Sequence, residues 1–305
     1  MLFRKSSISP QPICPECGST DVYWHPESDD FLCFSCKHQF INDETAEKYK
    51  YSLSLVDSRL LCIPRWVFTK RYLKTLDLSA EPYDDFHGPV INRIEVISPE
   101  IGNLTSLEEL DISSNNFSEL PSEIGHCKEL RRLFLADNYI EKIPVTIGKL
   151  KKLEVLMLRK NRVGSVPGQI GGLTSLRSLY LDHNHLKRLP KTIGKLKNIK
   201  VLDISNNEIQ VVPDEICMLK ELVTLELQEN QIKTLPEEIG LLTKLETLNL
   251  GRNRLTNLPR SIVKLVNLKN FTINENYDLS SPPYNVAKNG LNAIQDWFAD
   301  ADNYT

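Results

Sequence analysis

Residues 153–175 read LEVLMLRKNRVGSVPGQIGGLTS, and residues 176–198 read LRSLYLDHNHLKRLPKTIGKLKN. Both stretches open with LxxLxLxxN and continue with an apolar residue, a Pro, an Ile-Gly pair and a Leu at matching positions. The same period of 23 holds along most of the chain, with an apolar residue at each step: Leu107, Leu130, Leu153, Leu176, Ile199, Leu222, Leu245 and Leu268. Self-similarity at a fixed period of about 20–50 residues indicates a repeat architecture.

The first half of each repeat predicts a short β-strand with one buried face. In LxL the apolar side chains alternate with others, which is the period of a strand. One such strand cannot bury its apolar face alone, so neighbouring coils must stack and share a core. The Pro in the second half prevents the strand from continuing and predicts a short irregular or 3-10-like segment on the opposite, convex side.

One Asn in each repeat follows the predicted strand. Its amide group has two donors and an acceptor, so it can bond backbone groups of adjacent coils that would otherwise be unpaired. The predicted ladder contains Asn115, Asn138, Asn161, Asn184, Asn207, Asn230, Asn253 and Asn276.

Weaker copies of the repeat extend the array toward the N-terminus. Leu73, Leu76 and Leu78 form one predicted strand, and Asn92 occupies the ladder position of the same coil. Leu73 and Leu107 are 34 residues apart instead of 23, so eleven extra residues are expected to bulge out near 79–90. One further unit around residues 53–67 brings the prediction to ten strands.

The complete pattern resembles the leucine-rich-repeat family, and its LPxxIGxL form is similar to the intracellular class found in Ras-pathway scaffolds and Roco proteins. The resemblance covers most of the chain. It implies an α/β fold, a right-handed curved solenoid with a parallel β-sheet on its concave face. It also implies a non-catalytic scaffold for a protein partner, such as a small GTPase of the Ras-like kind or another signalling protein.

The C-terminal segment predicts a cap for the end of the solenoid. A helix is expected over roughly 284–299, because apolar residues recur at helical spacing after two prolines: Val286, Leu291, Ile294, Trp297 and Phe298. The segment resembles the stretch that closes the repeat array in Roco proteins. No GxxxxGK[ST] motif occurs in the chain, so the resemblance implies a fold boundary and not a GTPase activity.

Two CxxC motifs near the N-terminus predict a structural zinc site. Cys14, Cys17, Cys33 and Cys36 form a CxxC-x15-CxxC arrangement, which suits a tetrahedral Zn²⁺ ion held by four thiolates in a zinc ribbon. Two disulfides are the alternative and fit a reducing compartment poorly. Iron of the rubredoxin type would usually have a longer gap between the pairs. The predicted division is therefore a ribbon over 1–45, a solenoid over 46–283, and a capping helix and tail over 284–305.

Charge and hydropathy limit the partners and the compartment. The net charge is −3, and residues 1–50 hold five basic and eight acidic residues, so the charge argues against nucleic acid as a ligand. A nucleic-acid-associated adaptor acting through the ribbon stays open as the alternative. The N-terminus has no apolar core of a signal peptide, and no apolar run is long enough to span a bilayer. A cytoplasmic protein that is not an enzyme and has no membrane partner is expected.

The strand positions that point away from the core predict where a partner binds. The middle outward column places Phe134, Met157 and Tyr180 side by side. The rest of the predicted site surrounds them: Arg132, Arg159, Asp182, Asp203 and Glu226. Aromatic, Met and Arg side chains grouped on a surface are typical of binding hot spots. The alternative is a scatter of exposed apolar residues, which is common on proteins.

Overall fold

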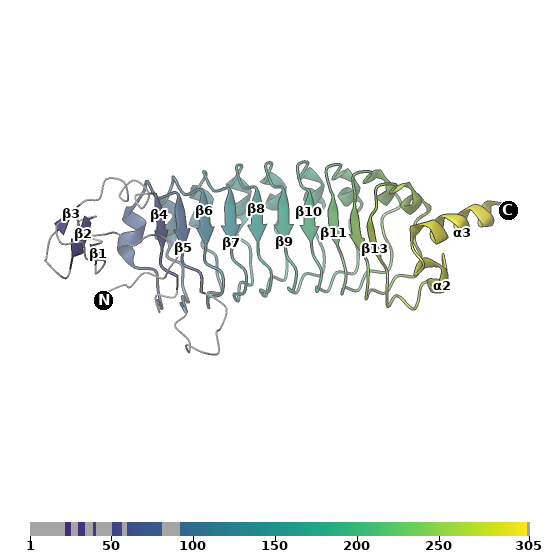
Figure 1. Cartoon of the computed structure of the whole chain (residues 1–305), viewed down its shortest axis with the longest axis horizontal. Helices are drawn as coiled ribbons and strands as arrows, with labels where there is room; N and C mark the ends of the chain where they lie inside the picture. The colour runs from purple at the N-terminus through teal and green to yellow at the C-terminus, as the bar shows by residue number, and fades with distance from the viewer. Residues whose placement is uncertain are drawn as a thin grey trace.

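A computed structural model of the chain describes residues 22–25, 30–33, 39–40, 51–56, 60–80 and 92–303. From residue 51 onward it is an elongated stack of coils, in which strands line one side and short 3-10 helices line the other (Figure 1). Two short α-helices follow the last coil at the C-terminal end of the stack (Figure 1).

Ten parallel strands form one sheet, as the sequence predicts. Each strand pairs with the strands of the coils before and after it, in chain order. The pairing keeps the repeat in phase, so that Leu156 lies opposite Leu133 on one side and Leu179 on the other. The strands are β4 (Ser52–Ser54), β5 (Thr75–Asp77), β6 (Glu109–Asp111), β7 (Arg132–Phe134), β8 (Val155–Met157), β9 (Ser178–Tyr180), β10 (Val201–Asp203), β11 (Thr224–Glu226), β12 (Thr247–Asn249) and β13 (Asn270–Thr272).

The opposite side of each coil holds a 3-10 helix, most often directly after the repeated Pro. In η4 (Val145–Lys149), Pro144 has an extended backbone and its carbonyl accepts from the Ile147 amide at 3.0 Å. Pro lacks an N–H for strand pairing, so it suits the position where the chain turns. The remaining segments are η1 (Arg65–Thr69), η2 (Pro99–Asn103), η3 (Ser122–His126), η5 (Gly168–Gly172), η6 (Lys191–Lys195), η7 (Asp214–Met218), η8 (Ile239–Leu241) and η9 (Arg260–Lys264).

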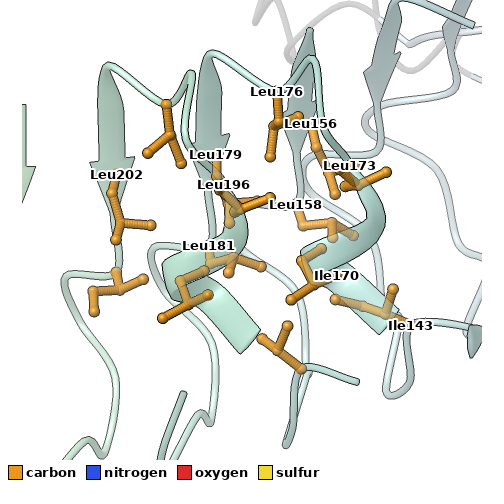
Figure 2. Packing of buried hydrophobic residues seen from close by; sticks show 14 of the residues in the cluster. Ile143, Leu156, Leu158, Ile170, Leu173, Leu176, Leu179, Leu181, Leu196 and Leu202 are labelled. Carbon is orange, nitrogen blue, oxygen red and sulfur yellow. The ribbon is translucent and has the colours of Figure 1, made fainter. Parts of the chain in front are cut away.

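The core is a continuous column of aliphatic side chains inside the coils. Figure 2 shows Leu156 and Leu158 beside Ile170 of η5 and Leu173, which directly follows η5. All four are at most 1% exposed. Each fully buried Leu or Ile contributes about 1.5–3 kcal/mol relative to an exposed one. Every coil shares this contribution with its neighbours, so the array is stabilised by contacts between adjacent coils.

The predicted Asn ladder joins each coil to the preceding ones. Asn161 Nδ2 donates to the carbonyl of Leu135 in the preceding coil at 2.9 Å, and to those of Leu158 and Arg159 in its own coil at 3.1 Å. Its Oδ1 accepts from the Ile140 amide at 2.9 Å. The same set recurs at the other ladder positions, except that Oδ1 of Asn138 has no partner among the described residues. The ladder therefore satisfies buried backbone groups that the short strands leave free.

The insertion lies where the spacing predicts it. Thr75 of β5 pairs with Glu109 of β6, so the two coils stay in register although 34 residues separate them. Asn92 joins the ladder, since its Oδ1 accepts from the Leu60 amide at 2.9 Å. That bond spans 32 residues, whereas the equivalent bonds elsewhere span 21, and the difference is the eleven-residue insertion. Residues 81–91 lie outside the described residues.

The Gly of the repeated Ile-Gly pair allows neighbouring 3-10 segments to approach closely. A Cβ atom on Gly171 would lie 2.6 Å from the carbonyl oxygen of Thr192 in the next coil. Real Cβ atoms do not approach a backbone oxygen so closely, so a side chain here would push the coils apart. The close spacing of the coils on this side therefore depends on Gly.

The C-terminal cap differs from the single helix predicted over 284–299. Two helices are present, α2 (Tyr284–Ala287) and α3 (Leu291–Asn303). Gly290 has a φ of +97°, and this left-handed conformation breaks the helix between them. Ala287, Ile294 and Phe298 are buried against the end of the solenoid, so the apolar periodicity identified the cap but not its break.

A second, separate sheet precedes the solenoid. It contains β1 (Val22–His25), β2 (Asp30–Cys33) and β3 (Gln39–Phe40) in antiparallel order. Of the four predicted zinc ligands, Cys33 ends β2, while Cys14, Cys17 and Cys36 lie outside the described residues. Across the described ranges, no group of three or more His, Cys, Asp or Glu residues is arranged to hold a metal ion.

Replacing one interior ladder residue is expected to destabilise the whole array. Asn161→Ala leaves a backbone N–H and up to three carbonyls without their partner, so we expect the free energy of unfolding to fall by about 1–3 kcal/mol. Denaturant unfolding followed by circular dichroism measures this change. Asn116→Ala is the matched control, because Asn116 is exposed. Equal stability of the two variants would contradict the role of the ladder.

Candidate protein-binding surface

The sheet has one face against the core and one open face, on which three positions of each coil form columns: the first and last residues of the strand and the second residue after it. The middle column carries Phe134, Met157 and Tyr180 on consecutive strands, and the strand register places them directly beside one another. We call these three residues the apolar patch. Each is half-buried. The sequence-predicted grouping of these three residues is therefore present in the structure.

Two arginines lie beside the apolar patch, and each is held by a carboxylate. Arg132, on the same strand as Phe134, donates from Nε to Oε2 of Glu109 at 2.8 Å and also contacts it through Nη2. Arg159 Nε lies 3.6 Å from Oδ2 of Asp182. About half of each arginine side chain is exposed. The guanidinium groups are therefore oriented and still accessible to a partner.

Asp182 lies at the predicted position but is more buried than the other predicted site residues. It is 5% exposed, and its Oδ2 also lies 3.0 Å from Nδ1 of His183. Little of its surface is left for a partner. Its carboxylate orients Arg159, so its contribution to the surface is indirect.

The apolar patch is followed by two carboxylates in the same column, as predicted. Asp203 Oδ1 accepts from the amide and the hydroxyl of Ser205 at 3.0 and 2.7 Å. Burial raises the pKa of Asp203, and the two bonds from Ser205 oppose this rise. Burial and the neighbouring charge of Asp203 also raise the pKa of Glu226. Both groups are therefore harder to ionise than free carboxyls, although the usual Asp and Glu pKa values lie well below neutral pH.

Two further carboxylates of the middle column, Asp77 and Asp111, are absent from the predicted site. They precede the apolar patch on β5 and β6, and each accepts through Oδ1 from the amide of the Ser two residues later, at 3.0 and 2.9 Å. Burial raises the pKa of Asp111, and the charge of Asp77 adds to this. The repeated Asp-x-Ser at the end of the strand is a sequence signal that could have identified them.

The two buried cysteines of the solenoid show no features of a reactive thiol. Burial raises the pKa of Cys127 to about 12 and, together with nearby acidic groups, that of Cys217 to about 11, so both thiols stay protonated. Cys62 is exposed. No helix in the described part of the chain is long and apolar enough to cross a membrane.

Comparison with known families identifies the repeat. The leucine rich repeat pattern matches residues 90–140, 128–186 and 220–277, and a leucine-rich repeat region matches 165–231. The chain belongs to the leucine-rich-repeat family. Proteins of this family are generally non-catalytic, and no catalytic domain is identified in the chain. None of the curated proteins matches it.

Similar solved structures come from bacteria and plants. A leucine-rich-repeat protein of Leptospira interrogans is 35% identical over 77% of this chain and 57% of its own, with a TM-score of 0.64. The TDR receptor is 29% identical over 70% of this chain and 36% of its own, with a TM-score of 0.63. The Arabidopsis receptor kinase HAESA, solved with the peptide hormone IDA and a co-receptor, is 29% identical over 68% of this chain and 34% of its own, with a TM-score of 0.57. The chain thus spans less than two thirds of the length of each.

The raised pKa of Asp203 predicts how stability depends on pH. In the unfolded chain the Asp203 carboxyl ionises at a lower pH than in the folded protein. Ionisation therefore lowers the free energy of unfolding as pH rises from the unfolded pKa through the folded pKa, and the loss is complete above it. Asp203→Asn keeps the acceptor for Ser205 and removes the charge. We therefore expect a higher melting temperature than wild type at neutral pH and no difference near pH 3, where both forms are neutral. Thermal unfolding across this range tests it, and an unchanged melting temperature at neutral pH would contradict it.

Proposed function

We propose that this chain is a non-catalytic scaffold that binds a partner protein on the open face of its sheet, over β7 to β11. The apolar patch is the observation that carries the proposal. The proposed contact residues are Arg132, Phe134, Met157, Arg159, Tyr180, Asp203 and Glu226, with Asp182 orienting Arg159.

The composition of this area supports binding over a purely structural role. Phe134, Met157 and Tyr180 lie in one column, and two accessible arginines lie beside this column. Aromatic residues, Met and Arg are all enriched at protein interfaces. In the same column the later coils carry Asn249 and Thr272, so large apolar side chains are not required by the repeat itself. HAESA, a family member with a similar fold, is solved with a peptide hormone. Peptide or protein recognition is therefore compatible with this scaffold.

The class of partner is proposed from the sequence resemblance. The LPxxIGxL form of the repeat favours a cytoplasmic signalling protein, with a small Ras-like GTPase as one candidate. The alternative is a nucleic-acid-associated adaptor. Strongly salt-dependent binding of the full chain to RNA or DNA would favour that alternative.

Truncating the apolar patch is expected to abolish partner capture. Phe134→Ala with Tyr180→Ala removes the aromatic contacts, so we expect at least about a tenfold loss of captured partner in an affinity pull-down. The melting temperature should change little, because both side chains lie on the open face and not in the core. Tyr139→Ala is the matched control: it removes an exposed aromatic ring from the same coil but from outside the open face. Unchanged capture by the double variant would contradict the proposal.

We further propose that Cys14, Cys17, Cys33 and Cys36 hold one structural Zn²⁺ ion. Four thiols in two CxxC pairs are a donor set that zinc prefers. Strands β1 and β2 form an antiparallel hairpin between the two pairs, with Cys33 at its end, which suits a ribbon. The metal would stabilise the fold of a segment of about 45 residues, which is too short to build a large core of its own.

Metal analysis tests the zinc proposal directly. The purified full-length chain is expected to contain one zinc per molecule by mass spectrometry. Cys33→Ser combined with Cys36→Ser should lower this toward zero, because two of four ligands are lost. Cys62→Ser is the control, since Cys62 is exposed and lies in the solenoid. Zinc content that does not depend on Cys33 and Cys36 would overturn the assignment.

A further inference from the structure

The middle column of the open face has an ordered distribution of charge. Along β5 to β11 it reads acidic, acidic, three large apolar residues, acidic, acidic. The members are Asp77, Asp111, Phe134, Met157, Tyr180, Asp203 and Glu226, and each lies beside the next through the strand register. The apolar patch is therefore bracketed by a pair of carboxylates on each side.

These four carboxylates lack the ion pairs that acidic residues just before the strands make. One residue before the strands, Lys74 lies 3.0 Å from Glu108, and Arg131 lies 3.0 Å from Glu154. By contrast, none of the four forms an ion pair with a Lys, Arg or His nitrogen within 4.0 Å of its carboxylate oxygens among the described residues, although the charge of Arg159 lowers the pKa of Asp203 from a greater distance. The two arginines on the three outward columns of β5 to β11 are already paired with Glu109 and Asp182. The open face thus has an excess of negative charge around an apolar centre.

Two acceptor atoms on this face also have no donor. Oε2 of Glu226 and Oε1 of Gln228 are buried and have no hydrogen-bond partner within the described part of the chain. In Asp111 and Asp203, Oδ1 is fixed by a Ser, which orients the carboxylate. Unpaired buried acceptors cost free energy, and donors supplied by a ligand would recover it. A cationic side chain supplies such donors and also offsets the charge.

We infer that the open face takes an extended segment of a partner protein that carries two basic side chains about six residues apart, with large apolar side chains between them. This inference rests on the proposed function and specifies its ligand. The apolar side chains of the segment would contact the apolar patch. One basic side chain would meet Asp77 and Asp111, and the other would meet Asp203 and Glu226.

The spacing follows from the geometry of the sheet. Asp111 and Asp203 lie on β6 and β10, which are four strand-to-strand steps apart. At about 4.8 Å per step the two carboxylates are about 19 Å apart, and an extended chain advances about 3.3 Å per residue. About six residues therefore separate the two basic positions.

Charge argues against a second copy of this chain as the occupant. If two copies packed through the same face in a symmetric dimer, one excess of carboxylates would lie against another. Like charges brought together in an interface cost free energy and suppress such pairing. A segment of opposite charge is favoured by the same electrostatics.

Selection from a displayed library of random peptides against the full-length chain tests the inference. We expect enriched peptides to carry two Arg or Lys about six positions apart, with aromatic or aliphatic residues between them. A synthetic peptide of this type should lose about tenfold in affinity, measured by fluorescence anisotropy, when either basic residue becomes Gln. We call the peptide with Arg at both basic positions the Arg peptide, and its two versions with one Arg replaced by Gln the single-Gln peptides. Asp111→Asn and Asp203→Asn should each weaken binding of the Arg peptide. Each variant should leave the binding of one of the two single-Gln peptides nearly unchanged.

Reversing the charge of one carboxylate position and of one peptide position provides the most specific test. A single-Glu peptide is the Arg peptide with one of its two Arg residues replaced by Glu. Asp203→Lys should bind one of the two single-Glu peptides better than the Arg peptide. Asp111→Lys should bind the other single-Glu peptide better than the Arg peptide. Enriched peptides without basic residues, or no enriched peptides, would overturn the inference. If neutral peptides bind and depend on Phe134 and Tyr180, the inference fails and the proposed function stands. If basic peptides bind equally to the variant lacking both aromatic rings, the proposed site itself fails.

Discussion

The structure depends on one repeated interaction, the side-chain amide of Asn bonded to the backbone of its own coil and the preceding one. Strands of three residues leave most of each coil outside a sheet, so many backbone groups near the core have no strand partner. Asn161 supplies donors to three carbonyls and an acceptor to one amide at once. Because each ladder residue joins its coil to its neighbours, the ladder sets the register from coil to coil. That register aligns the columns on the open face, and the apolar patch exists because three coils are held in phase.

The sequence predicted the features that depend on periodicity. The ten strands, the ladder and the insertion follow from the spacing of Leu and Asn, because burial and backbone pairing force the same residue type into the same position in every coil. The sequence was less informative about which charged side chains of the open face are exposed and which are held by their neighbours. A pattern indicates that Asp182 points away from the core, but it does not reveal that His183 and Arg159 lie against it and bury it. The break between α2 and α3 was missed for a similar reason, since the apolar spacing of a capping helix continues across Gly290.

The half-buried state of the apolar patch bears on how it could bind. Adjacent strands lie about 4.8 Å apart, so the register places Phe134, Met157 and Tyr180 next to one another, and each is half-buried before any partner arrives. This lowers the cost of exposing apolar surface in the free protein. It also restricts the side chains, so less conformational entropy is lost on binding. The arginines beside them are held in the same way, each by a carboxylate of an adjacent coil.

The solenoid separates the residues that hold the fold from those available to a partner. In a stack where each coil contacts mainly its neighbours, stability is close to a sum over coils and their interfaces. The core and ladder positions account for that sum, whereas the middle column of the open face contributes little to it. Four carboxylates without a cationic partner are therefore tolerable on this column, although burial makes three of them harder to ionise. A repeat can carry Asp, Phe, Glu or Asn at the same position without changing its backbone, as β6, β7, β11 and β12 do. The sequence of this column is consequently free to vary without loss of the fold, and the proposed ligand would account for its order of acidic and apolar residues.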